Sequence, residues 1–87
     1  MAVFMVERSL KGIGMDALAG AQQAAIRTAG EMSVEGQKVN YIRTTFSPDD
    51  GRCFCLFEAA DAASVEALQK RAGLPFDRVT PAMDLTP

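Results

Sequence analysis

The sequence predicts an α+β fold of the ferredoxin-like class, a βαββαβ sandwich with an antiparallel sheet in the order 4-1-3-2. The turn-forming residues Pro48, Asp49, Asp50 and Gly51 separate two β-rich runs in the middle of the chain. A strand-then-helix pattern precedes this hairpin, and a helix-then-strand pattern follows it. Right-handed crossovers on both sides place both helices on one face of the sheet and leave the other face open.

The composition is that of a folded globular protein. The 87 residues, 48% hydrophobic and 23% charged, suit a single domain spanning residues 1–87, and a chain this short gains stability from dimerisation. A formal net charge of −2 gives no field to hold nucleic acid or an anionic membrane. No apolar run approaches the ~20 residues of a membrane span, and charge interrupts the N-terminal apolar run early. We therefore expect a cytoplasmic protein that binds neither nucleic acid nor membrane.

The first half of the chain predicts a strand and a helix. Residues 3–8 are apolar and β-branched or aromatic enough for a strand. Asp16 is the expected N-cap of the helix that follows. The apolar positions of that helix fit one face, and most of them are alanine, which lets the helix lie close to the sheet: Leu18, Ala21, Ala25, Ile26, Ala29 and Met32.

The second half predicts another helix and an edge strand. Asp61 is the expected N-cap. Gly73 suits the left-handed position after the helix, and Pro75 prevents continuation. Gln69, with the two cations that follow it, is expected in solvent. Residues 78–85 alternate as a strand, and Pro81 lacks a donor, so this strand should lie at a sheet edge.

Cys53 and Cys55 are one residue apart on a predicted strand. Their side chains would point the same way, roughly 6.5 Å apart along the strand, which is poor geometry for a disulfide. A Cys-x-Cys pair can hold a soft metal, but buried cysteine usually packs as a small hydrophobe, and this interpretation is favoured.

Alternation along the strands sorts the side chains into two faces. One set is expected against the helices: Phe4, Val6, Ile42, Phe46, Cys53, Cys55 and Phe57. The other set is expected on the open face: Val3, Met5, Glu7, Tyr41, Arg43, Thr45, Phe54, Leu56 and Glu58. An open face with several large apolar side chains is typical of an interface.

The candidate site combines two carboxylates on the open face. The first and third strands are expected to run parallel as neighbours, which places Glu7 and Glu58 at equivalent C-terminal strand ends, about 5 Å apart. Tyr41 and Arg78 would extend the row on either side, and Arg43 is a further candidate for ligand binding. Close carboxylates need a cation, a shared proton or water. We expect Glu7 and Glu58 to be the metal ligands if a metal binds, and ordinary strand-end ion pairs are the alternative.

Several other chemistries have no support in the sequence. With no histidine, the chain has no imidazole for general-base catalysis or metal ligation. The glycines do not form a phosphate-binding loop. The serines have no adjacent base and are typical of caps and turns.

Four segments carry a resemblance to a known family: Phe-Met-Val-Glu-Arg at 4–8, Asp-Gly-Arg-Cys-Phe-Cys-Leu-Phe-Glu-Ala at 50–59, Asp61, and Arg-Ala-Gly-Leu-Pro at 71–75. The chain resembles short bacterial nickel-binding proteins also described as a domain of unknown function. The resemblance spans nearly the whole chain. It implies a ferredoxin-like homodimer, and the family name implies Ni²⁺ as cofactor; another divalent cation, or no cofactor, is the alternative. Glu7 and Glu58 with a phenol suit a hard, oxygen-seeking ion better than nickel.

Three functional hypotheses follow. The first is a cytoplasmic homodimer that binds a metal ion or small ligand at an acidic site on the open sheet face. The second is a cofactor-free dimeric α+β-barrel enzyme that performs acid/base chemistry on a small organic substrate. The third is a structural dimer without ligand. Stoichiometric bound metal would favour the metal-binding homodimer. A raised carboxylate pKa without metal would favour the enzyme, and the absence of both would favour the structural dimer.

Overall fold

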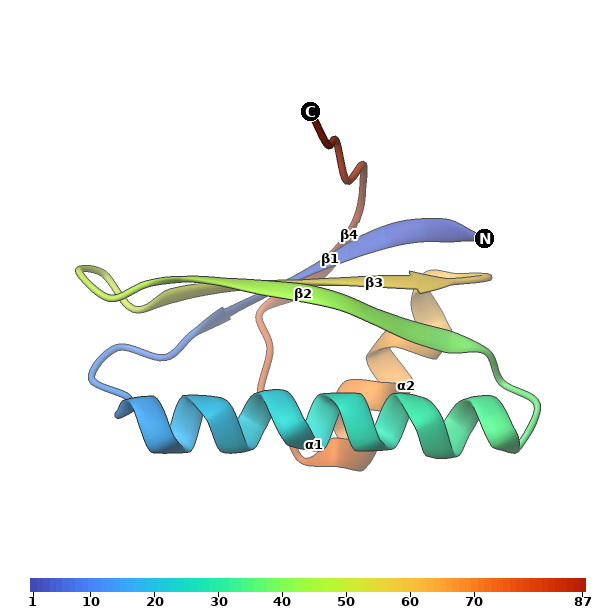
Figure 1. The fold of residues 1–87 in the computed structure, drawn as a ribbon, viewed down its shortest axis with the longest axis horizontal. Coiled ribbons are helices and arrows are strands. Elements are labelled where there is room, and N and C mark those ends of the chain that lie inside the picture. Colours follow the sequence, from blue (N-terminus) through green and yellow to red (C-terminus); the bar gives the residue numbers. More distant parts are fainter.

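The computed structural model describes all residues, 1–87. Six elements follow in the predicted βαββαβ order (Figure 1). They are β1 (Ala2–Ser9), α1 (Met15–Val34), β2 (Val39–Ser47), β3 (Arg52–Ala59), α2 (Ala62–Ala72) and β4 (Arg78–Ala82). The last strand is shorter than expected, because residues 83–87 leave the sheet.

The strands form one sheet in the order β2-β3-β1-β4, which is the predicted 4-1-3-2 order read from the other edge. All three neighbouring pairs are antiparallel. The expectation that the first and third strands run parallel is therefore wrong. The reason is topological: α1 returns the chain so that β2 runs in the direction of β1, and the hairpin then reverses β3. As expected, Pro81 lies on an edge strand.

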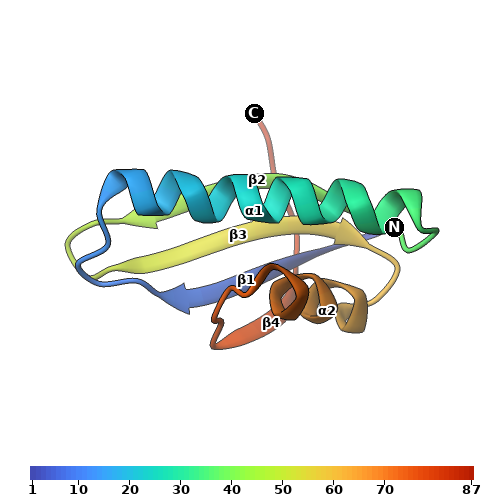
Figure 2. The same cartoon turned by 90° about the horizontal axis from the view of Figure 1, so that it is seen from below.

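Both helices cover the same face of the sheet, and the C-terminal tail rises from the opposite face (Figures 1 and 2). The core between helices and sheet contains the expected inward residues of the two central strands, Phe4, Val6, Cys53, Cys55 and Phe57. From α1 it contains Ala25, Ala29 and Met32, whereas Ile26 is 39% exposed. The small residues of α1 thus allow close packing, as the sequence predicts.

The helix ends differ in how well the sequence predicts them. Asp61 caps α2 as expected, because its carboxylate accepts a hydrogen bond from the Ser64 N–H at 2.9 Å. Gly73 ends that helix in the left-handed region with φ of +71°, as predicted. Asp16 is not the cap of α1: Gly14 occupies that position without a side-chain bond, and Asp16 lies in the first turn. There its negative charge still favours the positive helix end.

Arg8 and Gln69 form a buried polar contact that corrects another expectation. Gln69 is fully buried in α2 rather than solvated. Its Oε1 accepts a hydrogen bond from Arg8 Nη2 at 2.9 Å, and Arg8 Nη1 donates to the Pro75 carbonyl at 3.1 Å. A buried guanidinium needs such acceptors, because an unsatisfied buried donor is destabilising. The contact ties β1 to the end of α2.

A β-bulge in β2 changes which residues face the helices. The register jumps between Tyr41, opposite Phe57, and Arg43, opposite Leu56. Ile42 is the extra residue, and it does not pack in the core as expected. Because a bulge inserts one residue, the side chains before and after it swap faces. The uniform alternation assumed for this strand is therefore wrong.

Candidate functional site

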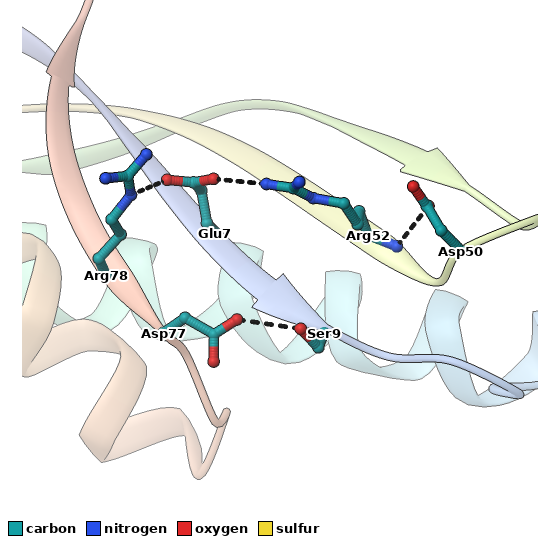
Figure 3. Close-up of polar contacts among 6 residues, drawn as sticks. All are labelled: Glu7, Ser9, Asp50, Arg52, Asp77 and Arg78. Atoms are coloured by element: carbon teal, nitrogen blue, oxygen red, sulfur yellow. Dashed lines mark hydrogen bonds and ion pairs between the residues drawn. The ribbon is translucent and has the colours of Figure 1, made fainter.

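The Glu7 carboxylate, near the end of β1, is a buried charged group on the open face. Its side chain is only 9% exposed. Arg52 Nη2 donates to Glu7 Oε1 at 3.1 Å, and Arg78 Nε donates to Glu7 Oε2. Figure 3 shows the carboxylate between the two guanidinium groups. Glu7 therefore holds one arginine from each neighbouring strand.

These two arginines lower the pKa of Glu7 below its ordinary value. The hydrogen bond from Arg78 is the largest cause, and the positive charges of Arg78 and Arg52 add to it, while desolvation opposes them. A carboxylate in this setting stays ionised at neutral pH. The raised carboxylate pKa expected for the enzyme hypothesis is thus the reverse of what Glu7 has.

A shallow pocket of about 330 Å³ opens beside this carboxylate. Its walls include Glu7, Arg52, Phe54, Asp77 and Arg78. The Arg52 guanidinium lies over the Phe54 ring, 5.2 Å from its centroid. On the opposite rim, the Ser9 hydroxyl donates to Asp77 Oδ2 at 3.1 Å (Figure 3). The pocket is therefore mainly polar, with charges of both signs.

The expected pairing of Glu7 with Glu58 does not exist. In the antiparallel register Glu7 lies opposite Phe54, and Glu58 lies opposite Val3. The two carboxylates are therefore at opposite ends of β1 and β3. Four residue positions separate Val3 from Glu7, or about 13 Å along the strand. The expected neighbour Arg78 is found beside Glu7.

Glu58 is half-buried and forms no ion pair or side-chain hydrogen bond within the chain. Its cross-strand neighbours are Val3 on β1 and Asn40 on β2. It is a carboxylate on the open face without a cation.

Tyr41 is turned toward the helices rather than to the open face, because it precedes the bulge. Its ring meets Phe57 edge-on at 5.6 Å. Its hydroxyl accepts from Gln22 Nε2 of α1 at 2.9 Å and lies 2.6 Å from the Thr44 hydroxyl. The predicted row of Tyr41, Glu58, Glu7 and Arg78 is therefore not a continuous site.

Arg43 lies on the open face as expected, and its partner comes from the tail. Its Nη2 donates to Asp84 Oδ2 at 2.8 Å. Since β2 and β4 are the two edges of the sheet, this contact brings the tail back across the open face (Figure 2). In that tail Met83 and Leu85 are 79% and 81% exposed.

Apolar side chains of the two central strands also lie on the open face. Val3, Met5, Phe54 and Leu56 lie there half-exposed, on the two central strands. No helix covers them, since both helices lie beneath the other face (Figure 1). These side chains, together with the exposed tail residues Met83 and Leu85, form an apolar surface outside the core.

Arg52 is the site residue that the sequence interpretation missed. It directly follows the hairpin turn and lies opposite Ser9, two residues beyond Glu7 on the same side of β1. The antiparallel register alone places it diagonally across from Glu7. Because the first and third strands were expected to run parallel, the sequence interpretation did not place Arg52 near Glu7.

Cys53 and Cys55 lie in the core, both reduced, as the favoured interpretation had them. Burial, with a smaller contribution from Cys55, raises the pKa of the Cys53 thiol to about 11. The Cys55 sulfur lies 3.2 Å from the Thr44 hydroxyl. These are the properties of packed, unreactive thiols.

No three side chains among Cys, Asp and Glu come together in a way that could hold a metal ion. Glu7 is engaged by two cations, and Glu58 is a single carboxylate. The groups that one chain brings together therefore do not make a nickel site by themselves. The two helices are also too short or too polar to cross a bilayer.

The fold and this surface define a small ferredoxin-like protein with an open, partly apolar sheet face that carries charged groups at its two ends. Comparison with known proteins agrees with this class. Residues 4–81 match the family of nickel responsive proteins SCO4226-like, and the chain belongs to that family. The crystal structure of SCO4226 from Streptomyces coelicolor A3(2) is similar, with a TM-score of 0.81 and 27% sequence identity over 98% of this chain and 100% of that one. No curated protein matches the chain.

Proposed function

We propose that this protein is a cytoplasmic homodimer that binds a divalent metal ion at the open sheet face, with Glu58 as the ligand that each chain contributes. Nickel is the first candidate, because the family is described as nickel responsive. The observation that carries the proposal is the half-buried Glu58 carboxylate, which has no cation of its own within the chain and lies between Val3 and Asn40 of the neighbouring strands.

The dimer follows from the uncovered apolar residues. Val3, Met5 and Leu56 lie half-exposed on the face that neither helix covers, and burying apolar surface is worth about 25 cal/mol per Å². A second copy on the same face would form a two-fold interface, in which the same residues meet from both sides.

The cation follows from the dimer. Packing a second copy on this face would remove Glu58 from water, and a buried carboxylate without a cation is strongly unfavourable. The nearby Arg43 is already paired with Asp84. A divalent cation shared between Glu58 of both copies would neutralise the two carboxylates. In this proposal the ligand set is completed only by the second copy, in agreement with the lack of a metal-binding cluster within one chain. Glu7 is a poor ligand here, because two guanidiniums would repel the ion.

The interface is tested by sedimentation of the wild type and of Leu56→Glu. We expect a native mass of twice the chain mass for the wild type and a single chain for the variant, because a charge at the centre of an apolar interface is poorly tolerated. A wild type that sediments as a monomer, or a variant that remains a dimer, would contradict the proposed interface.

Metal binding is tested by calorimetric titration of Ni²⁺, Mn²⁺ and Mg²⁺ into the wild type, Glu58→Gln and the matched control Glu66→Gln. Glu66 is also a partly exposed glutamate without an ion pair, but it lies on α2. We expect Glu58→Gln to abolish binding and Glu66→Gln to leave it unchanged. If the wild type binds none of the three ions, the structural-dimer hypothesis replaces this one.

A further inference from the structure

Arg52 and Arg78 have most of their hydrogen-bonding capacity unused. A guanidinium carries five N–H donors, and each arginine uses one of them on Glu7. The side chains are 56% and 67% exposed. In Figure 3 the terminal nitrogens of Arg78 point away from Glu7. Two cationic forks are thus available to a further acceptor.

Both forks are held in place before any ligand arrives. Glu7 is a fixed point, because it lies on a central strand and its side chain is 9% exposed. Arg52 is further fixed by its position over Phe54. Side chains that are already ordered lose less conformational entropy when they bind. The arrangement is therefore more favourable for binding than two free surface arginines.

The space beside them matches a small molecule. The pocket of about 330 Å³ lies at the lower end of the range for ligand sites, about 300–1,000 Å³. Its opposite rim carries Asp77 and the Ser9 hydroxyl that donates to it. A ligand that reaches across meets the two guanidinium groups with Glu7 between them on one side and the Asp77 carboxylate on the other.

We propose that this pocket binds a small organic monocarboxylate, held by the guanidinium groups of Arg52 and Arg78. A planar carboxylate matches the guanidinium fork and accepts paired, charge-assisted hydrogen bonds. The arginines balance Glu7, and Glu7 and Asp77 together repel a second negative charge, so a dicarboxylate or phosphate is disfavoured. Asp77 also accepts a hydrogen bond, which favours a hydroxyl group on the ligand. Glu58, the ligand of the proposed metal site, does not line this pocket. The carboxylate site therefore goes beyond the metal-binding function.

The test is an NMR titration of the ¹⁵N-labelled protein with lactate, a hydroxymonocarboxylate, and separately with succinate and inorganic phosphate. We expect saturable shifts of the Arg52 and Arg78 side-chain signals with lactate, and weaker binding of the other two. The absence of saturable shifts with lactate, or tighter binding of succinate or phosphate, would overturn the proposal.

Variants separate recognition by the fork from simple attraction by charge. Arg78→Gln should weaken lactate binding about tenfold or more, the value of one charge-assisted hydrogen bond. Arg78→Lys should weaken it similarly, because the charge remains but the fork is lost. Arg43→Gln is the matched control, since Arg43 is a 53% exposed, ion-paired arginine on the same face, and it should bind as the wild type does.

Wild-type affinity in Arg78→Lys, or equal losses in Arg43→Gln and Arg78→Gln, would overturn recognition by these forks. Arg52→Gln provides a second variant with the same expected loss. Glu58→Gln should bind lactate normally. A failure of the lactate site and a failure of the metal site would therefore be distinguishable.

Discussion

Replacing Gly51 with alanine should destabilise the fold more than the same change at other left-handed glycines. Gly51 closes the β2–β3 hairpin with φ of +74° and is buried. Its N–H donates to the Ser47 carbonyl at 2.8 Å, and its carbonyl accepts from the Leu10 N–H at 2.7 Å. An added Cβ would lie 2.2 Å from the Lys11 Cα. The atom it meets is backbone, which cannot rotate away.

The magnitude has two parts. A left-handed backbone conformation with a Cβ costs about 1–2 kcal/mol. Forcing the loop at Lys11 aside costs about a further 1–3 kcal/mol, the usual range for overpacking. Gly51→Ala should therefore lower the free energy of unfolding by about 2–5 kcal/mol, a large part of the stability of a small domain.

Gly12→Ala and Gly73→Ala are the controls. Both glycines have positive φ, +83° and +71°, but an added Cβ meets nothing within 4 Å at either. They should show only the backbone cost of about 1–2 kcal/mol. Urea unfolding at one fixed protein concentration measures all three variants, because the stability of the proposed dimer would depend on concentration. If Gly51→Ala lowered the free energy of unfolding no more than Gly73→Ala does, the close approach of the hairpin turn at Gly51 to the loop at Lys11 would be wrong.

Two further predictions concern titratable groups. The lowered pKa of Glu7 means that its ionised form stabilises the fold above the unfolded pKa near ~4.3, and that this stabilisation disappears as pH falls through the lower folded pKa. Wild type should therefore exceed Glu7→Gln in urea midpoint at neutral pH and lose that advantage in acid, and a difference independent of pH would contradict the ion-pair geometry. The Cys53 thiol, with its pKa raised to about 11 by burial, should react slowly with a thiol reagent near pH ~8.5, the ordinary thiol value, and rapidly once the chain is unfolded in guanidinium chloride. Fast labelling of the native protein at Cys53 would mean that α1 does not cover it.

The sequence by itself determined the features that depend on a few neighbouring residues. Asp61 caps α2 because a carboxylate reaches an N–H three residues on. Gly73 ends the same helix because only glycine adopts the left-handed backbone without strain. The Pro48 to Gly51 turn and the alternation along β3 also depend on neighbouring residues, and the order of elements then allowed few topologies. These signals were enough for the fold.

Only the tertiary structure decided where the polar side chains meet. One inserted residue in β2 turned Tyr41 toward Gln22, and no residue in that strand signals a bulge. The antiparallel register separated Glu7 from Glu58 and brought Arg52 to Glu7 instead. Register over a whole sheet is set by the sum of many pairings, and a single reversal of direction moves every cross-strand neighbour. The fold therefore followed from local chemistry, whereas the site depended on long-range pairing.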